Sequence, residues 1–196
     1  EKPMSEIKAI ETTYKGFRFR SRLEARWAVF FDALGIEWSY ETEGFECGGE
    51  RYLPDFYLPL SKDFVEIKPK GSYDLQKAHA LQKELRSEQD GRALILIAGD
   101  PWPWEYLVWM PFGCNVLIPC PTMQFAACQD CSCAELALSD AKGQEFLFTF
   151  ALHVCGAPQE EHDGKLTWFR LSDHPSRSTN RLAVAYQAAR SARFEH

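Results

Sequence analysis

Long hydrophobic runs are absent from this sequence. No segment approaches the roughly 20 apolar residues that a membrane-spanning helix requires. The opening residues, EKPMSEIKAIETTYKG, also lack the apolar region of a signal peptide. We therefore expect a cytoplasmic protein that has no membrane partner.

An overall positive charge is also missing. The 196 residues carry a net charge of −6, which argues against a protein that coats nucleic acid through uniform basicity. A local basic patch stays open, because electrostatic steering depends on where the charges lie. One such patch runs from residue 15 to residue 26, where five basic side chains accompany a single acid. These are Lys15, Arg18, Arg20, Arg22 and Arg26, with Glu24 as the acid.

Paired cysteines are not expected. The cysteine count is seven, an odd number, and thiols of a cytoplasmic protein are more often reduced or metal-bound. Four of them, Cys120, Cys128, Cys131 and Cys133, lie close together, and the spacing of Cys128 and Cys131 suits two thiolates on one Zn²⁺. A structural zinc site is one interpretation. The other is that several of these thiols are small buried side chains.

The remaining composition is typical of a globular protein, with 45% hydrophobic and 14% aromatic residues. Residues 22–35 have apolar side chains at helical spacing, after Ser21 as N-cap and with Gly35 as terminator. Three short strands are expected within residues 36–47, 48–60 and 63–71, then an amphipathic helix over 72–91 and a buried strand over 93–99. This order of helix, three-strand meander, helix and strand predicts an α/β fold with a mixed sheet flanked by helices.

Beyond residue 100 the pattern is less regular. Strands are expected within 105–110, 114–120, 146–154 and 165–171, and a basic helix within 181–194. The cysteine-rich stretch from residue 120 shows no clear periodicity. We therefore expect a core over residues 1–112 and a C-terminal extension over 113–196, in which zinc is one candidate stabiliser.

Candidate catalytic and metal-binding residues lie within residues 53–70, LPDFYLPLSKDFVEIKPK. In a strand Glu66 and Lys68 share one face, and the chain before them is long enough to turn back and bring Asp55 beside Glu66. Two carboxylates and the backbone carbonyl of Ile67 suit Mg²⁺ or Mn²⁺. A partly buried Lys68 could lose its proton and activate a water, or it could stay charged, orient the water and stabilise developing negative charge, as phosphodiester hydrolysis requires. Alternatively, Asp55 is a turn residue and Glu66 with Lys68 a surface charge pair.

Pro54-Asp55 followed by the triplet 66–68 resembles the motif of the PD-(D/E)XK nuclease superfamily, and the predicted element order agrees over residues 14 to about 100. The segment is similar to the Holliday-junction resolvases, the transposon-end-cleaving enzymes and phage-borne endonucleases. The resemblance implies a restriction-endonuclease-like core and a Mg²⁺- or Mn²⁺-dependent endodeoxyribonuclease. It also implies a bacterial or phage-infected cell as its setting.

The resemblance further implies roles for individual residues. Glu24, Asp55 and Glu66 would be metal-associated acids, Lys68 the catalytic lysine, and Gln76 a neighbour of the scissile phosphate. Glu24 has a second interpretation, because Ser21 and Glu24 also form a capping box.

The partner expected from this function is DNA. Arg18, Arg20 and Arg22 would contact its phosphates. A charged edge strand explains any one of them equally well, but the basic patch as a whole favours DNA contact. A homodimer would suit cleavage of both strands. Two other functions stay open: a DNA-binding or regulatory module without catalysis, and a zinc-centred interaction protein.

Overall fold

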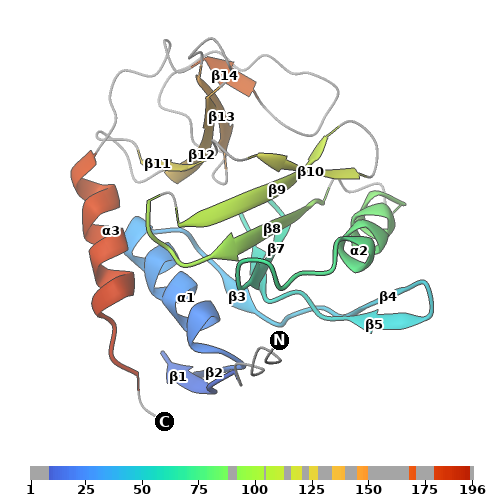
Figure 1. The fold of residues 1–196 in the computed structure, drawn as a ribbon, viewed down its shortest axis with the longest axis horizontal. Coiled ribbons are helices and arrows are strands. Elements are labelled where there is room, and N and C mark those ends of the chain that lie inside the picture. The colour runs from blue at the N-terminus through green and yellow to red at the C-terminus, as the bar shows by residue number, and fades with distance from the viewer. Residues whose placement is uncertain are drawn as a thin grey trace, which may run out of the picture.

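The central element of the fold is a six-stranded mixed sheet flanked by helices on both faces (Figure 1). A computed structural model describes residues 9–87, 92–103, 105–112, 116–120, 124–127, 134–139, 145–149, 168–170 and 179–194. The predicted α/β class is confirmed. In spatial order the sheet contains β10 (Val116–Cys120), β9 (Tyr106–Phe112), β8 (Leu94–Gly99), β7 (Asp63–Lys68), β6 (Phe56–Leu58) and β3 (Ser39–Tyr40).

Within this sheet β7 and β8 are parallel, and every other neighbouring pair is antiparallel. Parallel neighbours need a crossover, which α2 supplies between them. The described residues also form two hairpins, a four-stranded sheet and three helices. The hairpins are β1 (Thr12–Tyr14) with β2 (Phe17–Phe19), and β4 (Phe45–Cys47) with β5 (Glu50–Tyr52). The second sheet contains β11 (Gln124–Ala127), β12 (Ala134–Ser139), β13 (Glu145–Thr149) and β14 (Trp168–Arg170). The helices are α1 (Arg22–Leu34), α2 (Leu75–Ser87) and α3 (Thr179–Ser191).

The predicted helix over 22–35 is confirmed as α1. The Ser21 hydroxyl accepts a hydrogen bond from the backbone N–H of Glu24 at 3.2 Å. At the other end Gly35 adopts φ 74°, and its N–H donates to the carbonyl of Asp32. This left-handed residue is a common helix stop because glycine carries no Cβ penalty there. The helix therefore begins and ends where the capping residues predict.

The predicted three-strand meander is wrong in its first two strands. Each yields two short strands, so that β3 and β6 join the central sheet while β4 and β5 form a separate hairpin. The chain leaves the sheet at Glu41, which has φ 48°, and turns at Gly48 and Gly49, which have φ 62° and 85°. It re-enters after Pro54, whose missing N–H suits a strand boundary.

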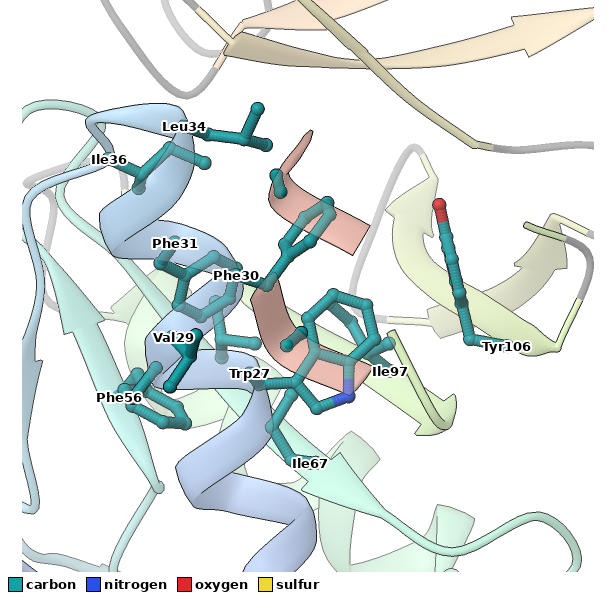
Figure 2. Close-up of a cluster of buried hydrophobic side chains, with 14 of the residues drawn as sticks. Trp27, Val29, Phe30, Phe31, Leu34, Ile36, Phe56, Ile67, Ile97 and Tyr106 are labelled. Atoms are coloured by element: carbon teal, nitrogen blue, oxygen red, sulfur yellow. The ribbon is translucent and has the colours of Figure 1, made fainter. Parts of the chain in front are cut away.

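One face of the sheet packs against α1 and α3. Figure 2 shows the aromatic side chains Trp27, Phe30 and Phe31 of α1 beside Ile67 and Ile97 of the sheet, all of them buried. The Phe30 ring lies 4.8 Å from that of Tyr186 in α3. Trp27 Nε1 donates to the carbonyl of Gly99 at 2.9 Å. These contacts fix the N-terminal turn of α1 near the carboxyl ends of β7 and β8.

The other face packs against α2 and the β4–β5 hairpin. Leu81 and Leu85 of α2 are fully buried with Phe64 and Leu94 of the sheet. Residues along β7 therefore alternate between the two cores, as the strand pattern predicts. No helix in the described ranges is long and apolar enough to cross a membrane.

The boundary expected between residues 112 and 113 falls inside this architecture. β10 is an edge strand of the central sheet, and α3 supplies Ala185, Tyr186 and Ala189 to the core around α1. The cysteine-rich stretch, where no element was expected, contains β11. Cys120 ends β10, whereas Cys128, Cys131 and Cys133 lie outside the described residues. The zinc site stays a prediction.

Candidate active site

The centre of the candidate site is the ammonium group of Lys68, near the carboxyl end of β7. Its Nζ contacts Oε1 of Glu66 and lies 3.6 Å from Oδ2 of Asp55. Asp55 immediately precedes β6, which pairs with β7 in antiparallel register. The three residues that sequence reasoning placed together are therefore in contact around one charge.

Asp55 is fully buried and tightly held. Its Oδ2 accepts the backbone N–H of Ile67 at 2.7 Å, and its Oδ1 accepts a guanidinium N–H of Arg20 at 2.8 Å. Burial raises the pKa of this carboxyl, and the negative charge of Glu66 raises it further, although Lys68 opposes the shift. Both oxygens keep spare lone pairs, because a carboxylate accepts about four hydrogen bonds. The carboxylate could therefore accept a further hydrogen bond or bind a cation.

Glu66 is buried too, and its Oε1 is engaged by Lys68. The Tyr52 hydroxyl interacts with the same carboxylate, although no protein donor lies in good hydrogen-bond geometry to the buried Oε2. Burial raises the pKa of Glu66 despite the opposing charge of Lys68. A buried acceptor without a partner costs stability. A cation or a ligand donor at Oε2 would remove that cost.

Lys68 remains a cation in this setting. Burial lowers its pKa, but Asp55 and Glu66 more than offset this, so that the pKa of Lys68 lies above its usual value. A deprotonated lysine that acts as a base is therefore disfavoured. The site instead holds a positive charge, and the lysine suits charge stabilisation and the positioning of a water.

Glu24 lies at the margin of the site and is already engaged. Its carboxylate accepts hydrogen bonds from the Tyr40 hydroxyl at 2.6 Å and from the backbone N–H of Arg20 at 3.1 Å, and it bonds the Ser21 hydroxyl at 2.7 Å. Ser21 in turn caps the helix through the N–H of Glu24. The Ser21 half of the predicted capping box is confirmed, whereas the Glu24 carboxylate accepts the backbone N–H of Arg20 instead of that of Ser21. A metal role for Glu24 stays a prediction, supported by its buried position and by its charge, which acts on both Asp55 and Lys68.

A cavity of about 310 Å³ opens at Glu66 and Lys68. Four basic side chains line it and two acidic ones, and three of the basic ones are also ion-paired, Arg20 to Glu41 and Asp55, Lys68 to Glu66 and Lys77 to Glu50. The basic residues are Arg20, Arg51, Lys68 and Lys77, and the acidic ones are Glu66 and Asp74. Sequence reasoning missed Arg51 because it lies on the β4–β5 hairpin, which was assigned to the meander. On α2 the sequence predicts Gln76 near the phosphate, but Gln76 is exposed and does not line the cavity. Its neighbour Lys77 does.

The three arginines predicted to contact DNA have different surroundings. Arg18 is exposed and pairs with Glu11. Arg20 forms ion pairs with Glu41 at 2.6 Å and with Asp55 at 2.8 Å. It therefore belongs to the group of charged residues around Asp55 and Glu66, called the acid cluster below. Arg22 is half-buried at the first residue of α1. Of the three, Arg20 alone lines the cavity.

The donor set fits a hard divalent cation. No group of three or more histidine, cysteine or acidic side chains suited to a metal occurs in the part of the chain that the structure describes. Mg²⁺ often takes only one or two carboxylates, however, and completes its shell with water and substrate phosphate. Glu66 and Asp55 are buried carboxylates whose pKa values are raised by burial, and both would gain from such an ion. The carbonyl of Ile67 lies beside them and already accepts from Lys68 Nζ at 3.2 Å.

Glu66→Gln is expected to stabilise the metal-free protein at pH 8. Because the folded-state pKa values of Asp55 and Glu66 lie above their ordinary values of about 4, the folded chain binds these protons more tightly than the unfolded chain. The free energy of unfolding is therefore highest at acidic pH and falls as pH rises through the raised pKa values. Thermal unfolding between pH 5 and 8 should show a smaller decline for Glu66→Gln than for the parent chain.

Bound Mn²⁺ should make the parent chain more stable than Glu66→Gln, the reverse of the metal-free result. Mn²⁺ at about 100 times its dissociation constant adds roughly 2.7 kcal/mol to the free energy of unfolding of a chain that binds it, or about 5–10 °C in Tm. We expect this gain for the parent chain and for Glu46→Gln, an exposed acid on β4, but not for Glu66→Gln. Equal responses of all three chains would contradict the assignment of Glu66.

The site thus combines two buried carboxylates, a charged lysine between them and a basic cavity in front. It can hold a divalent cation, bind a phosphate and stabilise negative charge that develops on it. No protein-family model, curated protein or solved structure matches this chain.

Proposed function

We propose that this chain is a metal-dependent DNA endonuclease with a PD-(D/E)XK site. The observation that carries the proposal is the position of Lys68, whose ammonium group contacts Glu66 and lies 3.6 Å from Asp55 at a cavity with a basic lining. A surface charge pair, the simpler interpretation, does not account for two buried carboxylates. Buried charges are rare unless they are paired or bind a metal.

The order of the elements supports the same assignment. α1 precedes the strands that carry Asp55 and the triplet 66–68, α2 follows them, and β8 lies parallel to β7 in the sheet centre. This agrees with a restriction-endonuclease-like core. The separate β4–β5 hairpin is an addition to that core, and it brings Arg51 to the cavity.

Each residue of the site has a task in phosphodiester hydrolysis. A divalent cation held by Asp55, Glu66 and the carbonyl of Ile67 would polarise the phosphoryl oxygen and lower the pKa of water. Lys68, which stays charged, orients the water and stabilises the charge that develops on the phosphate. Arg51 and Lys77 hold the substrate backbone at the cavity. Arg20 fixes the orientation of Asp55 through its 2.8 Å ion pair.

Cleavage of supercoiled plasmid tests the proposal. The parent chain should nick or linearise it with Mg²⁺ or Mn²⁺ and not with a chelator, and Asp55→Ala should be inactive because the buried carboxylate is lost. Glu46→Ala, which removes an exposed acid, should keep full activity. If linear, supercoiled and branched DNA all remain intact with both metals, the proposal fails. Retention of DNA binding in that case would favour a binding module without catalysis.

A further inference from the structure

A second cavity, of about 340 Å³, lies apart from the acid cluster. It is bounded by α1, the β8–β9 turn and α3, three elements that come together at one end of the central sheet (Figure 1). None of its residues lines the first cavity. The lining residues are Arg26, Asp100, Pro101, Trp102, Glu105 and Arg190.

Its most distinctive feature is a guanidinium group stacked on an indole. The Cζ atom of Arg190 lies 4.5 Å from the centroid of the Trp102 ring. Trp102 in turn packs edge-on against Tyr186 at 6.1 Å, so the ring is fixed from behind. Nucleobases that are free of a partner strand stack on aromatic rings and on guanidinium planes. The Arg190–Trp102 pair offers such a surface.

The cavity wall also carries an unused hydrogen-bond donor. Arg26 donates from Nη1 to Asp100 at 2.8 Å, while its Nε is buried with no hydrogen-bond partner. Leaving a buried charged donor unpaired is costly. Nε itself is shielded from solvent, so a phosphate oxygen or a base carbonyl would bind the accessible part of the Arg26 guanidinium, whose side chain is 39% exposed. The chemistry therefore fits a nucleotide, with a planar base and an acceptor, better than an apolar molecule.

The position of this cavity connects it to the first. Lys68 of β7 pairs in parallel register with Ala98 of β8, and Asp100 follows two residues later. With a strand spacing of about 4.8 Å and a rise of about 3.3 Å per residue, Asp100 lies on the order of 10 Å from Lys68. A few nucleotides of one strand span this distance. The first cavity lies beside α2 and the second beside α1 and α3, on the other face of the sheet, so a strand that reaches both would pass around the carboxyl ends of β7 and β8.

We propose that the cavity between Arg26, Trp102 and Arg190 binds an unpaired nucleotide of the DNA strand that is cut at Lys68. The inference rests on the proposed nuclease function, and it names the substrate class: DNA with a single-stranded segment beside the cleaved bond. A paired base cannot present its face to Arg190 without leaving the duplex stack, which costs a few kcal/mol. Overhangs, forks and branched DNA avoid this cost.

Fluorescence anisotropy in the presence of EDTA measures the effect on binding without cleavage. The probes are a blunt DNA hairpin and the same hairpin with a short single-stranded overhang. Because stacking contributes about 1–3 kcal/mol per base, the parent chain should prefer the overhang by roughly 5- to 150-fold. Arg190→Gln and Trp102→Leu should each remove most of this preference and leave affinity for the blunt hairpin unchanged. Arg193→Gln, an exposed arginine outside the cavity, is the matched control and should behave as the parent chain.

The outcomes separate this proposal from the nuclease assignment. Equal binding of both probes by the parent chain, or the same loss in Arg193→Gln as in Arg190→Gln, would overturn the subsite. Plasmid cleavage with no effect of Arg190→Gln on overhang binding would also overturn it, while the nuclease stands. A preference for the overhang that depends on Arg190, without any metal-dependent cleavage, would keep the subsite as a nucleic-acid site and remove the nuclease.

Discussion

Lys68→Met is expected to lower the rate of DNA cleavage by about 10²- to 10⁴-fold, the range associated with loss of an electrostatic or acid–base group. The methionine keeps the length and much of the stem of the side chain but removes the charge between Asp55 and Glu66. In the proposed function that charge stabilises the transition state, so kcat should fall with little change in KM. Single-turnover cleavage with saturating Mn²⁺ provides the measurement.

Lys77→Met is the matched comparison. Lys77 lines the same cavity from α2 but is not in contact with the two carboxylates. Its loss should weaken binding, raise KM and reduce the salt dependence of binding, and leave kcat nearly intact. Thermal unfolding must show that both variants fold. If Lys68→Met cleaves at the parental rate, the catalytic role of Lys68 is refuted even if DNA binding persists.

Gly99→Ala is expected to cause the largest loss of stability, about 2–5 kcal/mol. Gly99 has φ 127°, which side chains rarely adopt, and a Cβ there would lie 2.1 Å from the carbonyl oxygen of Glu105 and 2.8 Å from Cα of Tyr106. Both are backbone atoms, so the sheet itself would have to move. The carbonyl of Gly99 also accepts the hydrogen bond of Trp27, which the shift would disturb. Strain and overpacking of this kind account for the expected magnitude.

Thermal or urea unfolding measures this change, which corresponds to roughly 5–15 °C in Tm for a domain of this size. Gly71→Ala serves as control, because Gly71 has φ 74° but would place its Cβ in open space. Gly71→Ala should lose only about 1–2 kcal/mol of unfolding free energy, the cost of placing a non-glycine residue in the left-handed conformation. Similar losses at both positions would show that the contact with the β8–β9 turn is not the cause.

Much of the fold could be predicted because its signals are local. The apolar spacing of α1 between Ser21 and Gly35, and the fully apolar run of β8, depend on residues near each other in the chain. The division of the first two meander strands into four short ones could not be predicted. It depends on positive φ at Glu41 and on the pairing of β4 with β5 away from the main sheet. A non-glycine residue in the left-handed region leaves no strong signal in sequence.

The acid cluster was partly predictable for a similar reason. Strand alternation brings Glu66 and Lys68 to one face, and the hairpin brings Asp55 beside them. Arg20, in contrast, reaches Asp55 from 35 residues away. Its position in a basic stretch favoured a role at the surface. The charged state of Lys68 also could not be derived, because it results from the balance between burial and two carboxylates.

The packing of α3 against α1 has a consequence for how the chain reaches its native state. Tyr186 lies on the Phe30 ring, and its hydroxyl bonds that of Tyr106 at 2.8 Å, across 80 residues of sequence. During synthesis on the ribosome, α1 and the central strands emerge long before the helix that covers them. The core on this face therefore cannot close until α3 has left the exit tunnel, and we expect its aromatic side chains to be exposed in that interval.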